Sequence, residues 1–168
     1  KILVLGDVML DCYIEGSVRR ISPEAPVPIL NFEEEKNVLG GAGNVVHSLI
    51  NLGAEVKLST IVGDDSEGKI IEGLLSQLNM SLDYIHCTSN ISTTKKTRFI
   101  SKSSQLLRLD RDSEGFKSLD YLSLQNKLDS IYKIFDCVII SDYDKGVCSS
   151  RFIKDLISKA KNEGIPVF

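Results

Sequence analysis

The stretch from Gly40 to Asn44, "GGAGN", places three glycines and a side-chain amide just ahead of a helical pattern. Glycines let a ligand approach the backbone closely, and an Asn amide can both donate to and accept from a hydroxyl group. The N-terminus of the following helix adds a partial positive charge. This loop could therefore bind the pyrophosphate of a dinucleotide, the phosphates of ATP or the hydroxyls of a sugar.

The residues around the loop argue against both phosphate ligands. A dinucleotide-binding loop follows directly on an apolar strand, whereas "FEEEKNV" precedes this one, and Val46 stands where a small residue is required. The Gly-Lys-Ser/Thr ending of an ATP-binding P-loop is missing. Two interpretations remain, a loop that binds a polyol and a glycine turn that only caps a helix.

Acidic side chains follow two of the apolar strands expected from the sequence. Asp7 ends "KILVLGD" and Asp142 ends "CVIISD", and open α/β sheets bind ligands at the carboxyl ends of their strands. Asp7 could reach a ligand or only cap local backbone. Asp142, together with Lys145, could line a ligand site or order magnesium-bound water, or it could belong to a turn that caps a helix.

Basic side chains are concentrated in the stretch "TTKKTRFISKSSQLLRLDRD". Lys96 and Arg98 share one face of the first arm of an expected hairpin, and Arg108 lies on the returning arm, while Lys95 points the other way. Such cations can hold a phosphate, in a bidentate way where they are guanidinium groups. They could equally form a charged edge that prevents sheet-to-sheet aggregation.

The elements that must position these residues alternate between strands and helices. The alternation predicts a parallel sheet with right-handed crossovers. Strands are expected at 1–7, 54–65, 137–142 and 165–168, and helices at 45–53, 65–79, 119–135 and 149–164.

Two segments, 12–33 and 93–112, interrupt this alternation. The first contains three of the four prolines, which forbid a helix through its middle, and the second has the pattern of a hairpin. We expect the two segments to form one small sheet, a lid added to the α/β body.

Composition excludes several classes of function. The chain has 168 residues and a net charge of −3, so it has no basic surface for nucleic acid. No run of residues approaches the ~18 apolar positions of a membrane span. The four cysteines form no C-x-x-C pair, and with two histidines they make a zinc site unfavourable. We therefore expect a cytoplasmic protein whose cysteines are reduced. We expect no membrane partner, no nucleic-acid partner and no set of metal ligands.

The spacing of Gly40, Gly41, Asn44, Gly53 and Gly63 resembles the first signature of the ribokinase-like (PfkB) carbohydrate kinases. Four further stretches resemble the kinase domain of bacterial D-glycero-β-D-manno-heptose-7-phosphate kinases, namely "GDVMLD" (6–11), "RISPEAPVPIL" (20–30), "QLLRLD" (105–110) and "SDYDKG" (141–146). The resemblance covers essentially the whole chain. It departs at Val46, where the family usually has Ser, Thr or Ala.

The resemblance implies a ribokinase-like α/β fold, a mostly parallel sheet flanked by helices with a small β lid, of which residues 1–168 are the N-terminal portion. It implies phosphorylation of heptose 7-phosphate at C1 with ATP and Mg²⁺, on the route to the ADP-heptose of lipopolysaccharide. The family's catalytic Asp lies in a later Gly-Ala-Gly-Asp motif that residues 1–168 lack. We therefore expect no catalytic base here, ATP and Mg²⁺ held mainly by the C-terminal half, and no activity from this portion alone.

The resemblance also implies which residues contact the substrate. Asp11 matches the acid that holds sugar hydroxyls, although it could be a solvated turn residue. The full expected set is Asp11, Gly40, Gly41 and Asn44 for the hydroxyls, Lys96, Arg98 and Arg108 for the phosphate, and Asp142 and Lys145 at the junction with the nucleotide. Lids of this family often pair between subunits, so a homodimer is expected. The alternatives are a kinase for another sugar and a non-catalytic sugar-binding or dimerisation module.

Overall fold

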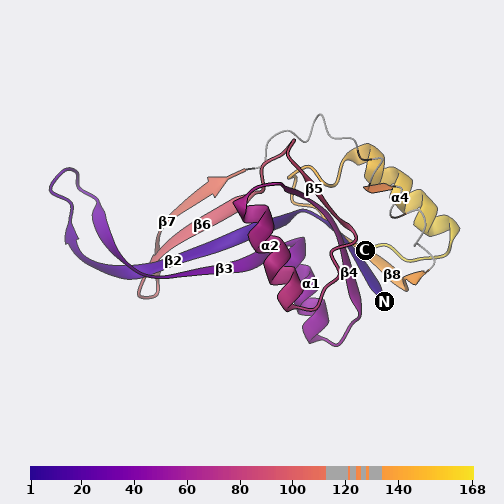
Figure 1. The fold of residues 1–168 in the computed structure, drawn as a ribbon, viewed down its shortest axis with the longest axis horizontal. Helices are drawn as coiled ribbons and strands as arrows, with labels where there is room; N and C mark the ends of the chain where they lie inside the picture. The colour runs from indigo at the N-terminus through magenta and orange to yellow at the C-terminus, as the bar shows by residue number, and fades with distance from the viewer. Residues whose placement is uncertain (113–120, 122–123, 126–127, 129–133) are drawn as a thin grey trace.

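The computed structural model describes all residues except 113–120, 122–123, 126–127 and 129–133. The described residues form two four-stranded sheets, a body sheet flanked by helices and a lid sheet that projects away from it (Figure 1). The body sheet has the strand order β5-β4-β1-β8, with β1 at Ile2–Gly6, β4 at Val56–Gly63, β5 at Ile85–Thr88 and β8 at Cys137–Ser141. The described helices are α1 (Ala42–Asn51), α2 (Ser66–Gln77) and α4 (Ser150–Asn162).

The body sheet is parallel throughout and apolar on both faces. Leu3 and Leu5 of β1 belong to a core cluster with residues of α4, while Val4 belongs to a second cluster with residues of α1 and α2. Successive side chains of a strand point to opposite faces, so a strand covered on both sides needs a continuous apolar run. "ILVLG" supplies that run, and the predicted α/β fold with a mostly parallel sheet is confirmed.

The lid sheet has the strand order β3-β2-β6-β7. Its strands are β2 (Val8–Ile21), β3 (Pro28–Gly41), β6 (Lys95–Ser101) and β7 (Ser104–Arg111). The proline-rich residues 22–27 form the turn at the tip, where the Ser22 amide donates to the Val27 carbonyl. Pro23 and Pro26 lie in this turn and Pro28 is the first residue of β3, so the prolines do not interrupt the strands. The β2–β3 pair extends beyond the expected range of 12–33 at both ends, from Val8 to Gly41.

The chain changes direction in the body sheet between β1 and β8. From β1 it proceeds to β4 and β5 on one side, and β8 then pairs with the other edge of β1. Crevices at such a switch point are where open α/β sheets bind ligands. Asp7 directly follows β1 and Asp142 directly follows β8, so both acids lie at this crevice.

The structure corrects three details expected from the sequence. A strand does precede the glycine loop, because β3 runs to Gly41, although it is a largely exposed edge strand of the antiparallel β2–β3 pair. Helix α1 begins at Ala42, so Asn44 lies in its first turn rather than in a loop. Strand β5 was not expected, since four residues carry little pattern.

Other expected elements agree with the structure where it describes them. Gly53 follows α1 with a φ of 85°, as a helix-ending glycine does, and Asp65 caps α2 by accepting from the Gly68 amide. Val167 forms a parallel bridge with Val138. The helix expected at 119–135 lies largely outside the described residues. No described helix has the length and apolar character needed to cross a membrane.

Gly6 provides a test of how closely β1 and β8 approach. It pairs with Ser141, and a Cβ at Gly6 would collide with the Ser141 carbonyl. We expect Gly6→Ala to lower the free energy of unfolding by about 2 kcal/mol or more, because backbone must shift to relieve the overlap. Urea titration measures this. Gly73→Ala is the matched control, since a Cβ there meets nothing within 4 Å and a helix interior gains up to about 1 kcal/mol from Ala. Equal midpoints for Gly6→Ala and the wild type would contradict the close packing.

Candidate functional site

The Asp7 side chain is buried and holds the loop that follows β8. Its Oδ2 atom accepts from the backbone amides of Tyr143 (2.8 Å) and Lys145 (3.2 Å), and its Oδ1 atom accepts from the amide of Val147 (2.9 Å). The backbone carbonyl of Asp7 also accepts from the Ala42 amide at the start of α1. Asp7 therefore organises the crevice through backbone contacts, and both of its carboxylate oxygens are engaged.

The loop held by Asp7 carries Asp142 and Lys145 at its surface. Asp142 is exposed, and its Oδ1 atom accepts from the Asp144 amide at 2.9 Å. The Lys145 ammonium group lies 2.8 Å from a carboxylate oxygen of Asp112, just beyond β7. The hydrogen bond to Asp112 raises the pKa of Lys145. This pair joins the β8 loop to the base of the lid.

Asp7, Asp142 and Cys148 form a cluster with possible ligand atoms within 4.8 Å of one another, among the residues that the structure describes. Burial, reinforced by the charges of Asp7 and Asp142, raises the pKa of the Cys148 thiol to about 12. The thiol is therefore protonated at neutral pH, and Asp7 is already bonded to three amides. Of the three side chains, only the exposed Asp142 carboxylate is therefore both ionisable at neutral pH and accessible to solvent. The absence of a metal ligand set in residues 1–168 stays a prediction.

Asp11 and Arg98 meet on one face of the lid sheet. Arg98 Nη1 lies 2.7 Å from Asp11 Oδ1, and the guanidinium group stacks over the Tyr13 ring at 5.2 Å from its centroid. The hydrogen bond to Asp11 raises the pKa of Arg98 further. A Cβ at Gly40 would lie 2.5 Å from Asp11 Oδ2, so the glycine makes room for this carboxylate. The structure thus brings together three of the predicted residues.

Lys96 and Arg108 lie on the same face. Lys96 is in register with Asp11 on one side and Asp110 on the other, and Arg108 is opposite Arg98. Asp110 pairs with Arg108, whose Nε atom is 3.0 Å from Asp110 Oδ1. The half-buried Lys96 makes no hydrogen bond or ion pair with any described residue. Two arginine–carboxylate pairs and one additional cation therefore share this face, which we call the charged face.

Gly41 and Asn44 lie at the start of α1. Gly41 has a φ of 57°, which favours glycine, and a Cβ there would collide with the Asp7 carbonyl. Asn44 is exposed, and no hydrogen bond between described residues joins its side chain to Asp11. Its predicted contact with a sugar hydroxyl stays a prediction.

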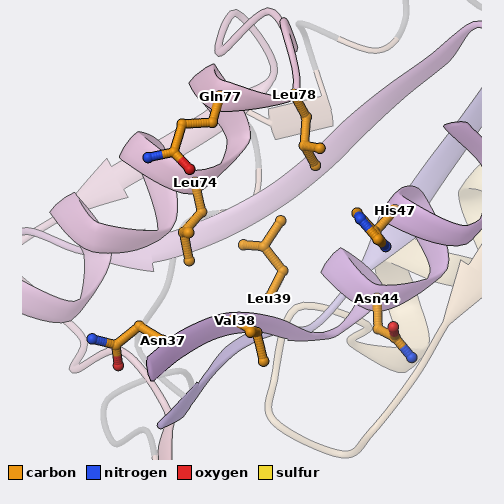
Figure 2. A pocket seen from close by; sticks show the side chains of 8 residues that line it. All are labelled: Asn37, Val38, Leu39, Asn44, His47, Leu74, Gln77 and Leu78. Atoms are coloured by element: carbon orange, nitrogen blue, oxygen red, sulfur yellow. The ribbon is translucent and has the colours of Figure 1, made fainter. Parts of the chain in front are cut away.

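A cavity of about 400 Å³ lies between α1, α2 and β3 (Figure 2). Leu39 points into its middle from β3, opposite Leu74 of α2, and the amide of Asn44 is directed away from that middle. Leu39 neighbours Val38, which pairs with Asp11, so Leu39 and Asp11 are on opposite faces of the lid sheet. The residues that line the cavity are Asn37, Val38, Leu39, Asn44, His47, Leu74, Gln77 and Leu78. The cavity is therefore separate from the charged face.

The sequence interpretation missed residues that complete the charged face. Tyr13 supports Arg98, Asp110 holds Arg108, and Asp112 holds Lys145. A period-two signal was available, because Tyr13 is two residues from Asp11 and Asp110 is two residues from Arg108. Which carboxylate pairs with which cation could not be read from that signal.

The two-sheet architecture, with a charged lid face beside a parallel α/β body, is that of the ribokinase-like sugar kinases. The sequence matches the model of the pfkB family carbohydrate kinases over residues 1–167, and the chain belongs to this family.

Curated relatives match this chain along nearly its whole length. The chain is 40% identical over 170 residues to the bifunctional protein HldE of Sulfurimonas denitrificans and 41% identical over 164 residues to that of Helicobacter hepaticus. These alignments cover 99% and 97% of this chain but 35% and 34% of the relatives, so the chain spans about a third of their length.

Solved structures share the fold. The ribokinase of Arabidopsis thaliana, complexed with ribose and ATP, superposes with a TM-score of 0.69 at 21% identity, and a carbohydrate kinase from Agrobacterium tumefaciens with 0.69 at 18% identity. Both matches cover 99% of this chain, and 51% and 52% of the respective structures. At these identities the likeness establishes the ribokinase-like fold alone.

Asp7→Asn tests the carboxylate that holds the β8 loop. An amide has only one acceptor oxygen, so its NH₂ group would face a backbone N–H that loses its partner. We expect the free energy of unfolding to fall by about 2–4 kcal/mol, since the bonds are charge-assisted and buried. Asp142→Asn on the same loop is the control, because that exposed side chain keeps an acceptor oxygen, and we expect a change below about 0.5 kcal/mol. Similar losses for the two variants in urea titrations would contradict the role of Asp7.

Proposed function

We propose that this chain supplies the sugar-binding half and lid of an ATP-dependent kinase that acts on a phosphorylated sugar. Our specific proposal is D-glycero-β-D-manno-heptose 7-phosphate, phosphorylated at C1 to heptose 1,7-bisphosphate for ADP-heptose and lipopolysaccharide core synthesis. The observation that carries it is Lys96, a half-buried ammonium group without a carboxylate partner among the described residues, beside the Asp11–Arg98 pair. Family membership and the HldE relatives support the same proposal.

The acidic and the basic side chains of the charged face would bind different parts of the substrate. The Asp11 carboxylate, oriented by Arg98, accepts hydrogen bonds from sugar hydroxyls, and Gly40 lets the sugar approach. Lys96 and the guanidinium groups of Arg98 and Arg108 attract the substrate's phosphate. Gly41 and Asn44 complete the hydroxyl contacts at the start of α1.

Asp142 and Lys145 would lie where the sugar meets the nucleotide. ATP supplies the transferred phosphoryl group, and the Asp142 carboxylate would contact water of the accompanying Mg²⁺ ion. We assign the general base to an Asp in a Gly-Ala-Gly-Asp motif outside residues 1–168, and most contacts to ATP to the same part. The four free cysteines support a cytoplasmic location.

A kinase for a neutral sugar is the second candidate. Arg98 and Arg108 are each already paired with a carboxylate, Asp11 and Asp110, which reduces the charge available to a phosphate. The two candidates differ in how strongly binding depends on the cations.

Lys96→Ala in the full-length protein separates the two candidates, whereas Arg98→Ala should weaken binding of either sugar because Arg98 also orients Asp11. For a phosphorylated substrate we expect Lys96→Ala to raise KM for the sugar about 10- to 100-fold, because a charge-assisted contact of roughly 1.5–3 kcal/mol is lost. Steady-state kinetics with heptose 7-phosphate measures this. Lys102→Gly is the control, since it removes a cation from the turn of the same hairpin at a residue whose φ of 56° suits glycine. An unchanged KM for Lys96→Ala would remove the phosphate-binding role.

A thermal-shift screen of the full-length protein tests the substrate. We expect heptose 7-phosphate to raise the Tm more than hexose phosphates and neutral sugars do. Equal shifts for all phosphorylated sugars would remove the heptose assignment, and shifts from neutral sugars alone would favour the second candidate.

We further propose a homodimer formed through the lid. Strand β7 is an edge strand and is exposed along its whole length, including Leu107 and Leu109. An exposed apolar edge of this kind invites pairing with a second chain. The lid is also the part that projects from the body (Figure 1).

Leu109→Glu tests the dimer. We expect it to shift the full-length protein from dimer to monomer at micromolar concentration, because a charge would be buried at the interface. Sedimentation velocity measures the change. Leu52→Glu is the control, as Leu52 is 83% exposed at the end of α1, outside the lid. A dimer that survives Leu109→Glu would remove this interface.

A further inference from the structure

The first turn of α2 contains a buried carboxylate, Glu67, whose side chain faces the lid instead of solvent. Glu67 is only 7% exposed although it lies at the start of a surface helix. A carboxylate is rarely buried to this extent unless it is paired. Its partners therefore define what this position does.

Both cationic partners of Glu67 come from the base of the β6–β7 hairpin. Arg111 Nη2 lies 2.6 Å from Glu67 Oε2, and Lys95 Nζ lies 3.6 Å from Oε1. Lys95 begins β6, Arg111 ends β7, and the two residues are in register. A single carboxylate thus holds both strands of the hairpin at the same level.

Asp65 holds the segment that enters the hairpin. Its Oδ1 atom caps α2 by accepting from the Gly68 amide, and its Oδ2 atom accepts from the Thr93 amide at 2.8 Å. The Thr93 hydroxyl in turn accepts from the Gly63 amide at 2.9 Å. The entry to β6 is therefore bonded to both the end of β4 and the start of α2.

The protonation of the two acids agrees with these contacts. Burial alone would raise the pKa of Glu67, but the hydrogen bonds from Arg111 and Ser66 outweigh it and lower the pKa. Burial is likewise outweighed at Asp65, where the amides of Thr93 and Gly68 lower the pKa. Both groups are ionised at neutral pH, so both ion pairs of Glu67 are present under working conditions.

The hairpin that Glu67 holds carries three cations of the proposed sugar-phosphate site. On β6, Lys96 is adjacent to Lys95 and Arg98 is three residues after Lys95. On β7, Arg108 is three residues before Arg111. Because side chains alternate along a strand, Lys95 and Arg111 point to α2 while the site cations point to the Asp11 face. A displacement at the base would move the cations relative to Asp11 on β2.

We propose that Glu67 is a positioning residue that anchors the β6–β7 hairpin to α2 and thereby sets where the site cations lie relative to Asp11. The proposal rests on the proposed function for its effect on the substrate. The anchoring itself does not depend on that function, because it is a contact between α2 and the lid.

Hydrogen–deuterium exchange of the ligand-free, full-length protein tests the anchor. In Glu67→Gln we expect the amides of β6 and β7 to exchange about tenfold faster, because a neutral amide cannot hold two cations. Asp64→Asn is the matched control, since Asp64 precedes the same helix and pairs only loosely, at 3.8 Å, with exposed Lys69. It should leave hairpin exchange unchanged. Arg111→Gln removes the other partner of the same ion pair, and the Arg111 side chain is half-exposed. This variant replaces Glu67→Gln in the experiment if Glu67→Gln fails to fold.

Kinetics then tests the consequence for the site. We expect Glu67→Gln and Arg111→Gln each to raise KM for the sugar phosphate about tenfold, with less than a twofold change in KM for ATP. A variant that was merely less stable would not separate the two substrates in this way. Hairpin exchange equal to that of Asp64→Asn in both variants would overturn the anchor. If exchange responds but the wild type turns over no sugar phosphate, the anchor stands and the proposed function fails.

Discussion

The buried Asp7 carboxylate is the interaction on which the site depends. An ionised group removed from water must be fully hydrogen-bonded, and Asp7 meets this requirement with the amides of Tyr143, Lys145 and Val147. The loop after β8 must therefore wrap around the end of β1. Since the Asp7 carbonyl also accepts from Ala42, the same residue connects the starts of α1 and of the lid to the crevice of the body sheet.

The position of Asp7 also explains how the two sheets are joined. It is the single residue between β1 of the body and β2 of the lid, so the chain passes from one sheet to the other without a flexible linker. Asp11 follows four residues later on β2, facing the cations of β6 and β7. The acid that would hold a sugar is thereby placed close to the crevice, and its distance from the body is set by the backbone.

Charge pairing organises the face that Asp11 shares with the hairpin. Asp11 holds Arg98 and Asp110 holds Arg108, which leaves Lys96 as the cation without a partner among the described residues. On the opposite face, Glu67 joins Arg111 and Lys95 to α2. The two faces of the hairpin are thus joined to different elements, one to β2 through Asp11 and the other to α2 through Glu67.

The sequence by itself determined the parallel α/β body, the turns and the hairpin, because β1 and β8 are continuous apolar runs, α1 and α2 have helical periodicity, and all four have clear ends. It also indicated which face of the hairpin carries Lys96 and Arg98. Only the tertiary structure decided that "FEEEKN" is a strand, since β3 is stabilised by pairing with β2 and not by its own pattern. The ion pairs were equally hidden: Arg98 is 87 residues from Asp11, and Tyr143 is 136 residues from Asp7. Local sequence specifies which groups need a partner, but the partner is chosen by which strands and loops the fold brings together.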